Sequence, residues 1–170
     1  EYVLNPFGQT ASPDKWYAFA VPFKVDMETG ITRKYGKRVD DMIVKFPAAM
    51  KCALGENPKS AFGQSKKCPK TRMGSAAVLR ELLFKARNYV KAKEDGKEPN
   101  FDMKLEAMIP VIKKEIPLKA HAHRADDIFT AIRIAKEFDL DLTLDHCTDG
   151  ELIADQLVGE GYPAFIGPSF

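Results

Sequence analysis

Short apolar runs alternate with amphipathic stretches most clearly in the last third of the chain. Residues 116–120, 141–144 and 164–166 have the pattern of short strands, and apolar side chains recur at helical spacing over 126–138 and 148–158. Strand, helix, strand, helix and strand joined by short connections predict right-handed crossovers and parallel strands. The apolar positions of the two predicted helices are Ile128, Ala131, Ile132, Ala135 and Phe138, and then Leu152, Ile153, Leu157 and Val158.

Side chains that can cap a helix stand at the start of both stretches. Asp126 or Asp127 can cap the first helix, and Thr148 or Asp149 the second. Each helix start therefore directly follows the carboxyl end of a predicted strand. In parallel α/β sheets this is the edge at which ligand-binding side chains gather.

The earlier part of the chain is less regular. Leucines at helical spacing predict a long helix over 74–93, and Asp102 can cap a further helix that Pro110 should bend. Residues 1–38 are predicted to form an irregular arm with one strand near 16–21. One or two helical turns are predicted over 39–46, and Pro47 ends them. A buried strand over 48–55 is predicted to run into Glu56, and residues 65–72 are predicted to form a solvated basic loop.

Composition excludes several classes of protein. The 170 residues include 26 basic and 24 acidic ones spread along the chain, with a net charge of +2, so we expect no binding to DNA or RNA. No apolar run approaches the ~18 residues of a membrane span, and the start lacks a signal-peptide pattern, so we expect a soluble, cytoplasmic protein. Three cysteines without a C-x-x-C pair are expected to be free thiols.

Two of the three histidines close neighbouring predicted strands. His121 follows the strand at 116–120, and His146 follows the strand at 141–144. Because parallel strands end at one edge of a sheet, the two imidazoles are expected to converge. Imidazole nitrogens and a carboxylate are common zinc ligands, and an ion with an open coordination position can activate water for attack on a carbonyl. We therefore predict a metal site of Glu56, His121 and His146. The alternative for Glu56 is a helix-capping or surface carboxylate that follows the glycine turn.

Other side chains near these strand ends have more than one interpretation. Lys51 competes with Glu56, since a carbamylated lysine can bridge two metals, but it is expected on the opposite strand face and farther from the strand end. His123 is expected on the other side of its strand, where it would support a metal ligand or face substrate instead of binding the ion. Arg124 could bind a substrate carboxylate or form an exposed salt bridge with Asp126 or Asp127.

The remaining polar neighbours have ordinary structural roles. Cys147 has no neighbour that marks it as a nucleophile, so a buried, inert thiol is favoured. Asp145 is expected to orient a metal ligand, and Asp149 to cap a helix.

The two histidine motifs resemble a known family. Lys119-Ala120-His121-Ala122-His123 and Asp145-His146-Cys147-Thr148-Asp149-Gly150 are similar to the fifth and sixth strands of the metal-dependent amidohydrolase superfamily, in its imidazolonepropionase-like branch. The segment 50–59 also resembles part of some members, which makes Glu56 the strand-four ligand. The resemblance implies an α/β fold, here a single partial (β/α)₈ TIM barrel domain over 1–170, with an irregular arm or strand at 1–38 and β/α units at 39–170.

The resemblance also implies an activity and its limits. Members hold one or two divalent ions, commonly zinc, and hydrolyse amide-type or cyclic C–N bonds of small molecules. The first-strand His-x-His pair and the last-strand catalytic aspartate of the family have no counterpart here, so the chain is expected to be an internal fragment or truncated member, inactive by itself. A barrel that lacks its first and last strands exposes two sheet edges, so we expect a homodimer or association with the missing barrel segments. The alternative is a non-catalytic α/β assembly module derived from an amidohydrolase.

Overall fold

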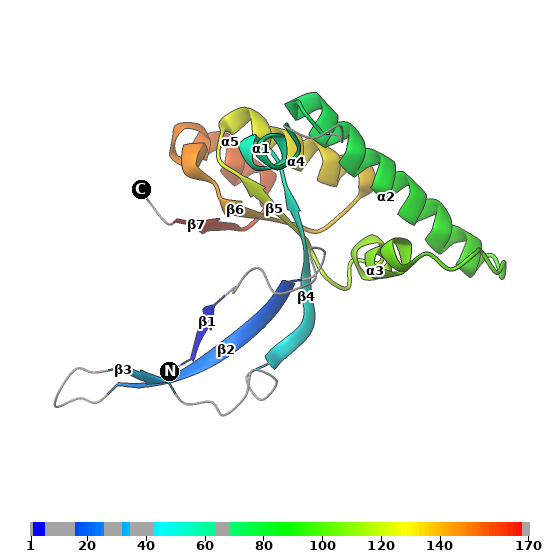
Figure 1. The fold of residues 1–170 in the computed structure, drawn as a ribbon. Coiled ribbons are helices and arrows are strands. Elements are labelled where there is room, and N and C mark those ends of the chain that lie inside the picture. Colours follow the sequence, from blue (N-terminus) through cyan, green and yellow to red (C-terminus); the bar gives the residue numbers. More distant parts are fainter. Residues whose placement is uncertain (1, 6–15, 26–31, 35–42, 64–68, 168–170) are drawn as a thin grey trace. The chain divides into compact units, whose positions relative to one another are not determined.

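The computed structural model describes residues 2–5, 16–25, 32–34, 43–63 and 69–167 (Figure 1). The chain separates into two compact units, Glu1–Ala49 and Met50–Phe170. The sequence pattern predicted one partial barrel domain with an arm that ends near residue 38.

The first unit contains antiparallel strands. β2 (Trp16–Val25) pairs with β1 (Tyr2–Asn5), with β3 (Thr32–Lys34) and with the first part of β4 (Ile43–Ala53). The strand predicted at 16–21 is confirmed, and it continues to Val25.

The helical turns predicted over 39–46 are wrong where the structure describes that range. Residues 43–46 belong to β4, and residues 39–42 lie outside the described residues. Ile43 and Val44 are β-branched and favour a strand, and Ile43 is in register with Phe19 of β2. Pairing with β2 thus decides the conformation, although Pro47 had suggested the end of a helix.

The second unit is an α/β structure built on four parallel strands. In spatial order these are Met50–Ala53 of β4, β5 (Leu118–Ala122), β6 (Leu142–His146) and β7 (Ala164–Ile166). Ala53, His121, Asp145 and Phe165 stand in one register row across the sheet. The parallel arrangement predicted for 116–166 is confirmed.

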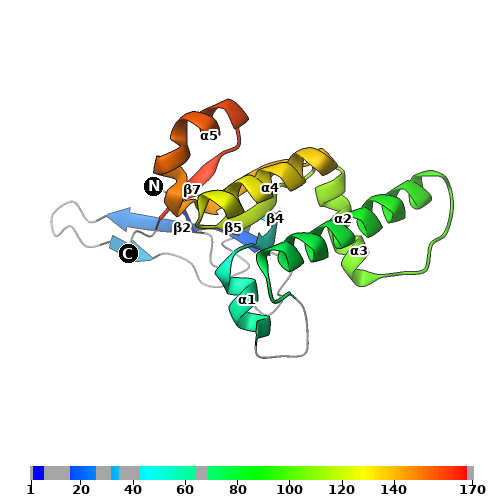
Figure 2. The ribbon, with the colours of Figure 1, turned by 90° about the horizontal axis from the view of Figure 1, so that it is seen from above.

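Helices cover one face of this sheet. The helices are α1 (Glu56–Gly63), α2 (Arg72–Glu94), α3 (Met103–Ile112), α4 (Ala125–Phe138), the 3₁₀ helix η2 (Thr148–Ile153) and α5 (Ala154–Glu160). Figure 1 shows α1, α4 and α5 on the same side of β5, β6 and β7, and Figure 2 shows α2 running beside α4.

The core lies between these helices and the sheet. It includes Leu118, Ala120, Ala122, Leu142 and Leu144 of the strands, and Leu83, Ile128, Ile132 and Ile134 of the helices, all buried. Successive strand residues point to opposite faces, so Lys119, His121, Thr143 and Asp145 share the other face of the sheet. The sheet therefore has an apolar face toward the helices and a polar face opposite.

The long helices begin at capping side chains. Thr71 Oγ1 accepts from the Gly74 amide at 3.0 Å at the start of α2, and Asp102 Oδ1 accepts from the Lys104 amide at 2.8 Å at the start of α3. The helix predicted over 74–93 and the cap at Asp102 are confirmed.

The start of α4 differs from the prediction. Arg124 is its N-cap residue and gives no side-chain cap, whereas Asp149 Oδ2 accepts from the Ala125 amide at 3.0 Å. The cap therefore comes from the loop after β6, while Asp126 and Asp127 lie within the first turn. Carboxylates in a first turn are favoured by the helix dipole.

The predicted helix over 148–158 is divided into η2 and α5. Two of its apolar positions, Leu152 and Val158, are 78% and 83% exposed.

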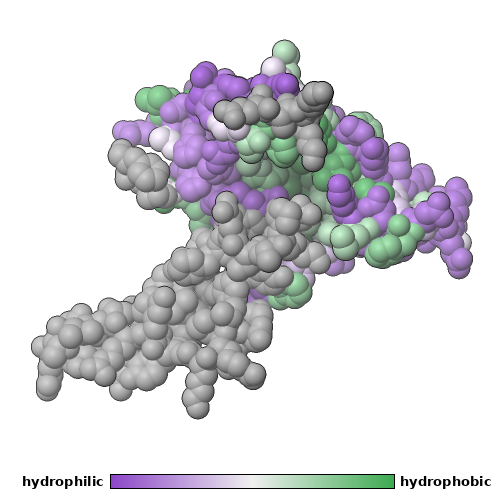
Figure 3. All heavy atoms as spheres, in the orientation of Figure 1, coloured by the Kyte–Doolittle hydropathy of each residue, from purple (hydrophilic) through white to green (hydrophobic). Residues whose placement is uncertain are grey.

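Figure 3 shows hydrophilic surface around the far end of α2 and apolar surface next to α3, where Phe101 and Met103 are exposed. No helix among the described residues is long and apolar enough to cross a membrane.

Candidate functional site

Three imidazole rings lie together at the carboxyl ends of β5 and β6. The centroids of His121 and His146 are 4.6 Å apart, those of His121 and His123 are 4.6 Å apart, and those of His123 and His146 are 5.0 Å apart. His146 is in register with Ala122, the last residue of β5. The predicted convergence of His121 and His146 at one sheet edge is thus confirmed.

The side predicted for His123 is wrong. Residues two positions apart in an extended chain point to the same face, so His123 follows His121. Its ring stacks on that of His146 with an interplanar angle of 12°. The spacing His121-Ala122-His123 was the signal that could have identified this third ring. Contact of His123 with a substrate stays a prediction.

Each ring is held by a hydrogen bond from another part of the second unit. Nε2 of His121 lies 2.9 Å from Asn57 Nδ2, Nδ1 of His123 lies 2.7 Å from Thr148 Oγ1, and Nδ1 of His146 lies 2.8 Å from the Gly167 carbonyl. Because a carbonyl oxygen can only accept, Nδ1 of His146 donates. The lone pair of a neutral His146 ring is therefore on Nε2.

The backbone at the end of β6 fixes the direction of the His146 ring. His146 and Cys147 have φ values of 70° and 49°, in the left-handed region that side chains other than glycine rarely adopt. The strand therefore ends abruptly at His146. The Cys147 amide donates to the Ala122 carbonyl at 3.0 Å, and the Asp149 amide donates to the His123 carbonyl at 2.8 Å.

A buried group of charges lies on the same sheet face as His121. Asp145 accepts from Lys51 and from Lys119, each at 2.9 Å, and the three side chains are 7–15% exposed. Burial by itself would raise the pKa of Asp145, but hydrogen bonds from Lys119 and Lys51 lower it below its ordinary value. The predicted role of Asp145 was to orient a ligand, whereas its observed partners are the two lysines. Lys51, which the sequence placed farther from the site, lies within it.

His121 is a neutral base at physiological pH. Burial, followed by the neighbouring His146, Lys51 and His123, lowers the pKa of His121 to about 4, while Asp145 opposes this shift. Only a neutral imidazole offers a lone pair to a metal ion or a proton. The environment of His121 therefore suits a ligand or a base.

Glu56 is not brought together with the histidines. It lies in the first turn of α1 with its side chain 62% exposed, 3.0 Å from Lys59 and 2.8 Å from Arg72. The hydrogen bond from Lys59, followed by that from Arg72, lowers its pKa. Among the described residues, no group of three His, Cys, Asp or Glu side chains is arranged to hold a metal ion.

The turn at Gly55 explains why the predicted set of Glu56, His121 and His146 does not assemble. Gly55 has a φ of 80°, and helix α1 begins at the next residue. This turn brings Glu56 to Arg72 and brings Asn57 to His121. Asn57 was missed by sequence reasoning, and its only signal was a polar side chain just beyond a strand end.

Two further predicted residues are engaged locally. Arg124 forms two hydrogen bonds of 3.1 Å with Asp126, which is the salt-bridge alternative that the sequence left open. Its contact with a substrate stays a prediction. Cys147 is 2% exposed, and burial followed by the charge of Asp149 raises its thiol pKa, as expected for an inert thiol.

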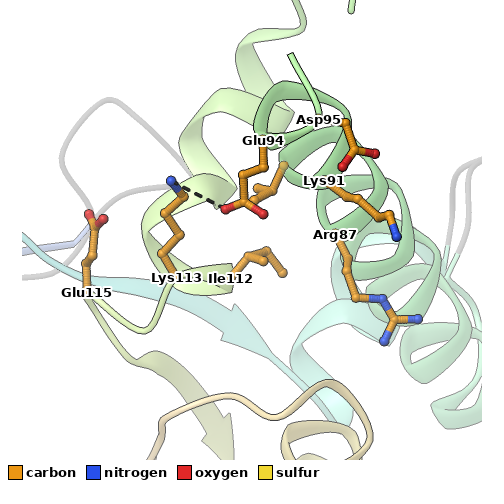
Figure 4. Close-up of a pocket in the computed structure, with 8 residues that line it drawn as sticks. Arg87, Lys91, Glu94, Asp95, Ile112, Lys113 and Glu115 are labelled. Carbon is orange, nitrogen blue, oxygen red and sulfur yellow. Dashed lines mark ion pairs between the residues drawn. The ribbon is translucent and has the colours of Figure 1, made fainter. Parts of the chain in front are cut away.

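A separate hollow lies between α2 and the end of α3 (Figure 4). It has a volume of about 710 Å³ and is lined by charged side chains that include Arg87, Glu94 and Lys113. Glu94 pairs with Lys113 at 3.7 Å. No histidine or cysteine lines it, so it offers none of the chemistry gathered at the strand ends.

Comparison with known proteins gives one informative likeness. No protein-family model matches the chain, and no curated protein does. Among solved structures, the crystal structure of an amidohydrolase from Thermotoga maritima MSB8 matches with a TM-score of 0.76 and 39% sequence identity. The match covers 94% of this chain and 40% of that protein, so the chain spans less than half of its length. The likeness supports membership of the amidohydrolases.

Proposed function

We propose that the chain carries part of the active site of a metal-dependent amidohydrolase that hydrolyses amide-type or cyclic C–N bonds of small molecules. The observation that carries the proposal is the group of three imidazole rings at the ends of β5 and β6. The 39% identity to an amidohydrolase supports it. The partial (β/α)₈ barrel and the imidazolonepropionase-like branch belong to the same proposal and are supported by the motifs at 119–123 and 145–150.

The chemistry of the donor set fits a divalent ion such as zinc. Metal-binding histidines commonly use one ring nitrogen for the ion and the other for a hydrogen bond to protein. Nε2 of His121 and Nδ1 of His146 are engaged in such bonds. We therefore assign Nδ1 of His121 and Nε2 of His146 to the ion.

Further ligands are needed beside these two nitrogens. Glu56 would have to release Arg72 and Lys59 to join them, and Lys51 would have to release Asp145. With two assigned ligands and no assigned catalytic base, we expect weak metal binding and little turnover from these 170 residues alone.

The chain's own residues have separate tasks in this proposal. A divalent ion, when bound, lowers the pKa of water and polarises the bond to be hydrolysed. His121 stays neutral because it is buried, and the Gly167 carbonyl fixes the tautomer of His146. Lys51 and Lys119 supply positive charge beside the rings, with Asp145 as their shared counter-ion. His123 and Arg124 are the candidates for contact with substrate.

Zinc binding tests the proposal. Isothermal titration with Zn²⁺ should give a saturable site in the wild-type chain, and His121→Ala and His146→Ala should each weaken binding at least tenfold. Asp155→Asn, an exposed change on α5, serves as the control. Equal zinc affinity in all four proteins would contradict the proposal. Glu56→Gln adds a discriminating case, because wild-type affinity in that variant would remove Glu56 from the ligand set.

A non-catalytic assembly module is the second candidate. It is favoured by the absence of a three-ligand group among the described residues and by the exposure of Phe165 and Ile166 on β7. It predicts self-association that is insensitive to EDTA, in a chain that binds no zinc.

A further inference from the structure

Asn57 contacts His121 although 64 positions separate the two residues. Its Nδ2 lies 2.9 Å from Nε2 of the imidazole. Asn57 is the second residue of α1, immediately after the turn that leaves β4, and it is exposed to solvent. Burial therefore does not hold Asn57 against His121. The contact depends on the conformation of the turn that precedes Asn57.

The turn before Asn57 is held from two sides. The Leu54 amide donates to the His121 carbonyl at 2.9 Å, which fixes the end of β4 to β5. A Cβ atom on Gly55 would lie 2.6 Å from Asp127 Oδ2, so the turn runs directly against the side chain of α4.

Arg72 joins these parts together. Its Nε donates to both carboxylate oxygens of Asp127, at 3.1 and 3.2 Å, and its Nη2 lies 2.8 Å from Glu56 Oε1. Asp127 is only 4% exposed, so this pair is largely shielded from solvent. The start of α1, and with it Asn57, therefore has a defined position relative to His121.

A carboxamide can bond to a neutral imidazole nitrogen in either protonation pattern. A neutral imidazole carries one N–H, on either Nδ1 or Nε2, and its other nitrogen has a lone pair. The amide of Asn57 donates to a bare Nε2 and, after a half-turn, accepts from a protonated Nε2. In both cases Nε2 is occupied. An aspartate could only accept, and a leucine could do neither.

We propose that Asn57 is a positioning residue for His121: its carboxamide holds Nε2, so that Nδ1 is the ring nitrogen that acts in the site. Without a ligand, Nδ1 carries the ring proton and the amide donates to Nε2. When Nδ1 binds an ion, the single ring proton is on Nε2 and the amide accepts it. The second state rests on the proposed function, whereas the first does not.

Nitrogen NMR of the metal-free chain tests the first state. The chain is labelled with ¹⁵N-histidine, and His121 is assigned by the signals lost in His121→Gln. At pH 7 we expect one His121 tautomer in the wild type, protonated on Nδ1. Asn57→Asp should move the proton to Nε2, and Asn57→Leu should give a mixture. Ser60→Ala, an exposed change on the same helix, should leave the wild-type spectrum.

Unchanged ring nitrogen shifts of His121 in both Asn57 variants would overturn the proposal. Circular dichroism checks that each variant keeps its helices. If Asn57→Leu does not fold, Asn57→Asp with Asn57→Gln as the conservative rescue decides the same question, because the glutamine variant should return the wild-type tautomer.

Zinc titration of the same variants tests the second state. Asn57→Leu should weaken zinc binding about 10- to 100-fold, while Asn57→Asp should stay within about threefold of wild type or bind more tightly. Equal affinities for the wild type and Asn57→Leu would overturn the positioning role and leave the proposed function standing. A chain that binds no zinc but shows the expected tautomer changes would refute the proposed function and support the role of Asn57.

Discussion

Asp145 pairs with two buried lysines on the polar face of the sheet. It is the shared counter-ion of Lys51 and Lys119, and all three side chains are largely shielded from water. A buried ion pair adds little net stability over apolar packing, but removal of one partner leaves uncompensated charge in the interior. Replacement of Asp145, the one carboxylate in this group of three side chains, should therefore reduce stability.

Asp145→Asn should lower the free energy of unfolding by about 3–5 kcal/mol, because two buried salt bridges, to Lys51 and to Lys119, lose their carboxylate. Urea denaturation at pH 7 measures the loss. Glu81→Gln is the matched control, since the Glu81–Lys85 pair is exposed and exposed pairs contribute little to stability. A loss for Asp145→Asn no greater than that of the control would contradict the assigned role.

His121 should make stability depend on pH. Its pKa is lowered from 6.5 to about 4 in the folded chain. Between these values the unfolded chain binds a proton at His121 and the folded chain does not, so stability falls as pH decreases from 6.5 to 4. The slope is at most about 1.4 kcal/mol per pH unit. Denaturation of the wild type and His121→Gln from pH 4 to 7.5 measures it, and identical slopes would show that His121 does not carry the effect.

At the scale of elements, the turn between β4 and α1 combines a left-handed backbone conformation with close packing. Gly55 has a positive φ and faces Asp127, which Arg72 holds in place. A side chain at this position would therefore be destabilised both by the left-handed φ and by the close approach to Asp127. Only the approach to Asp127 depends on the neighbouring helix α4.

Gly55→Ala should destabilise the chain by more than the ~1–2 kcal/mol of a left-handed alanine, since its Cβ also displaces Asp127. Gly96→Ala is the matched control, because Gly96 has a φ of 73° and nothing within 4 Å of its Cβ position. Thermal denaturation of both variants gives the difference that belongs to Asp127. Equal melting temperatures would mean that the Asp127 carboxylate moves aside without cost.

The elements that periodicity predicted are those whose own residues carry a regular pattern of apolar positions. The helix over 74–93 and the strands at 116–120, 141–144 and 164–166 all have counterparts in the structure. The exceptions depended on distant partners. Residues 43–46 follow the pairing of β2, and the cap of α4 comes from Asp149, 24 positions beyond Ala125. Neither partner can be identified from local spacing.

The site was predictable only to the extent that strand ends define it. His121 and His146 could be paired from the order of strands, because parallel neighbours end at one edge. Asn57 and Lys51 could not be assigned in this way, since their contacts depend on the turn at Gly55 and on the two lysines meeting one aspartate.

For the whole molecule, β7 suggests a surface for association. It is the last strand in the order of the second unit, and no strand among the described residues pairs with its other side. Phe165 and Ile166 are 52% and 75% exposed. An unpaired apolar edge strand is prone to pair with another chain.

We expect the chain to form a dimer in solution and Ile166→Lys to shift it toward monomer, since a charge on an edge strand opposes pairing. Size-exclusion chromatography with light scattering measures the mass. Leu152→Lys is the control, because Leu152 is equally exposed but lies in η2, outside the sheet. A monomeric wild-type chain, or equal dissociation in both variants, would contradict the role of β7.

The two loops that carry the histidines are fastened to each other residue by residue. Cys147 bonds to Ala122, Asp149 bonds to both His123 and Ala125, and Thr148 bonds to the His123 ring. A hydrogen-bond network of this kind opens as one cooperative unit. The amide protons of Ala125, Cys147 and Asp149 should therefore exchange with deuterium at a common rate. The loops beneath the three rings are therefore already ordered before a ligand binds. The affinity of the ligand is not reduced by the entropy of ordering these loops.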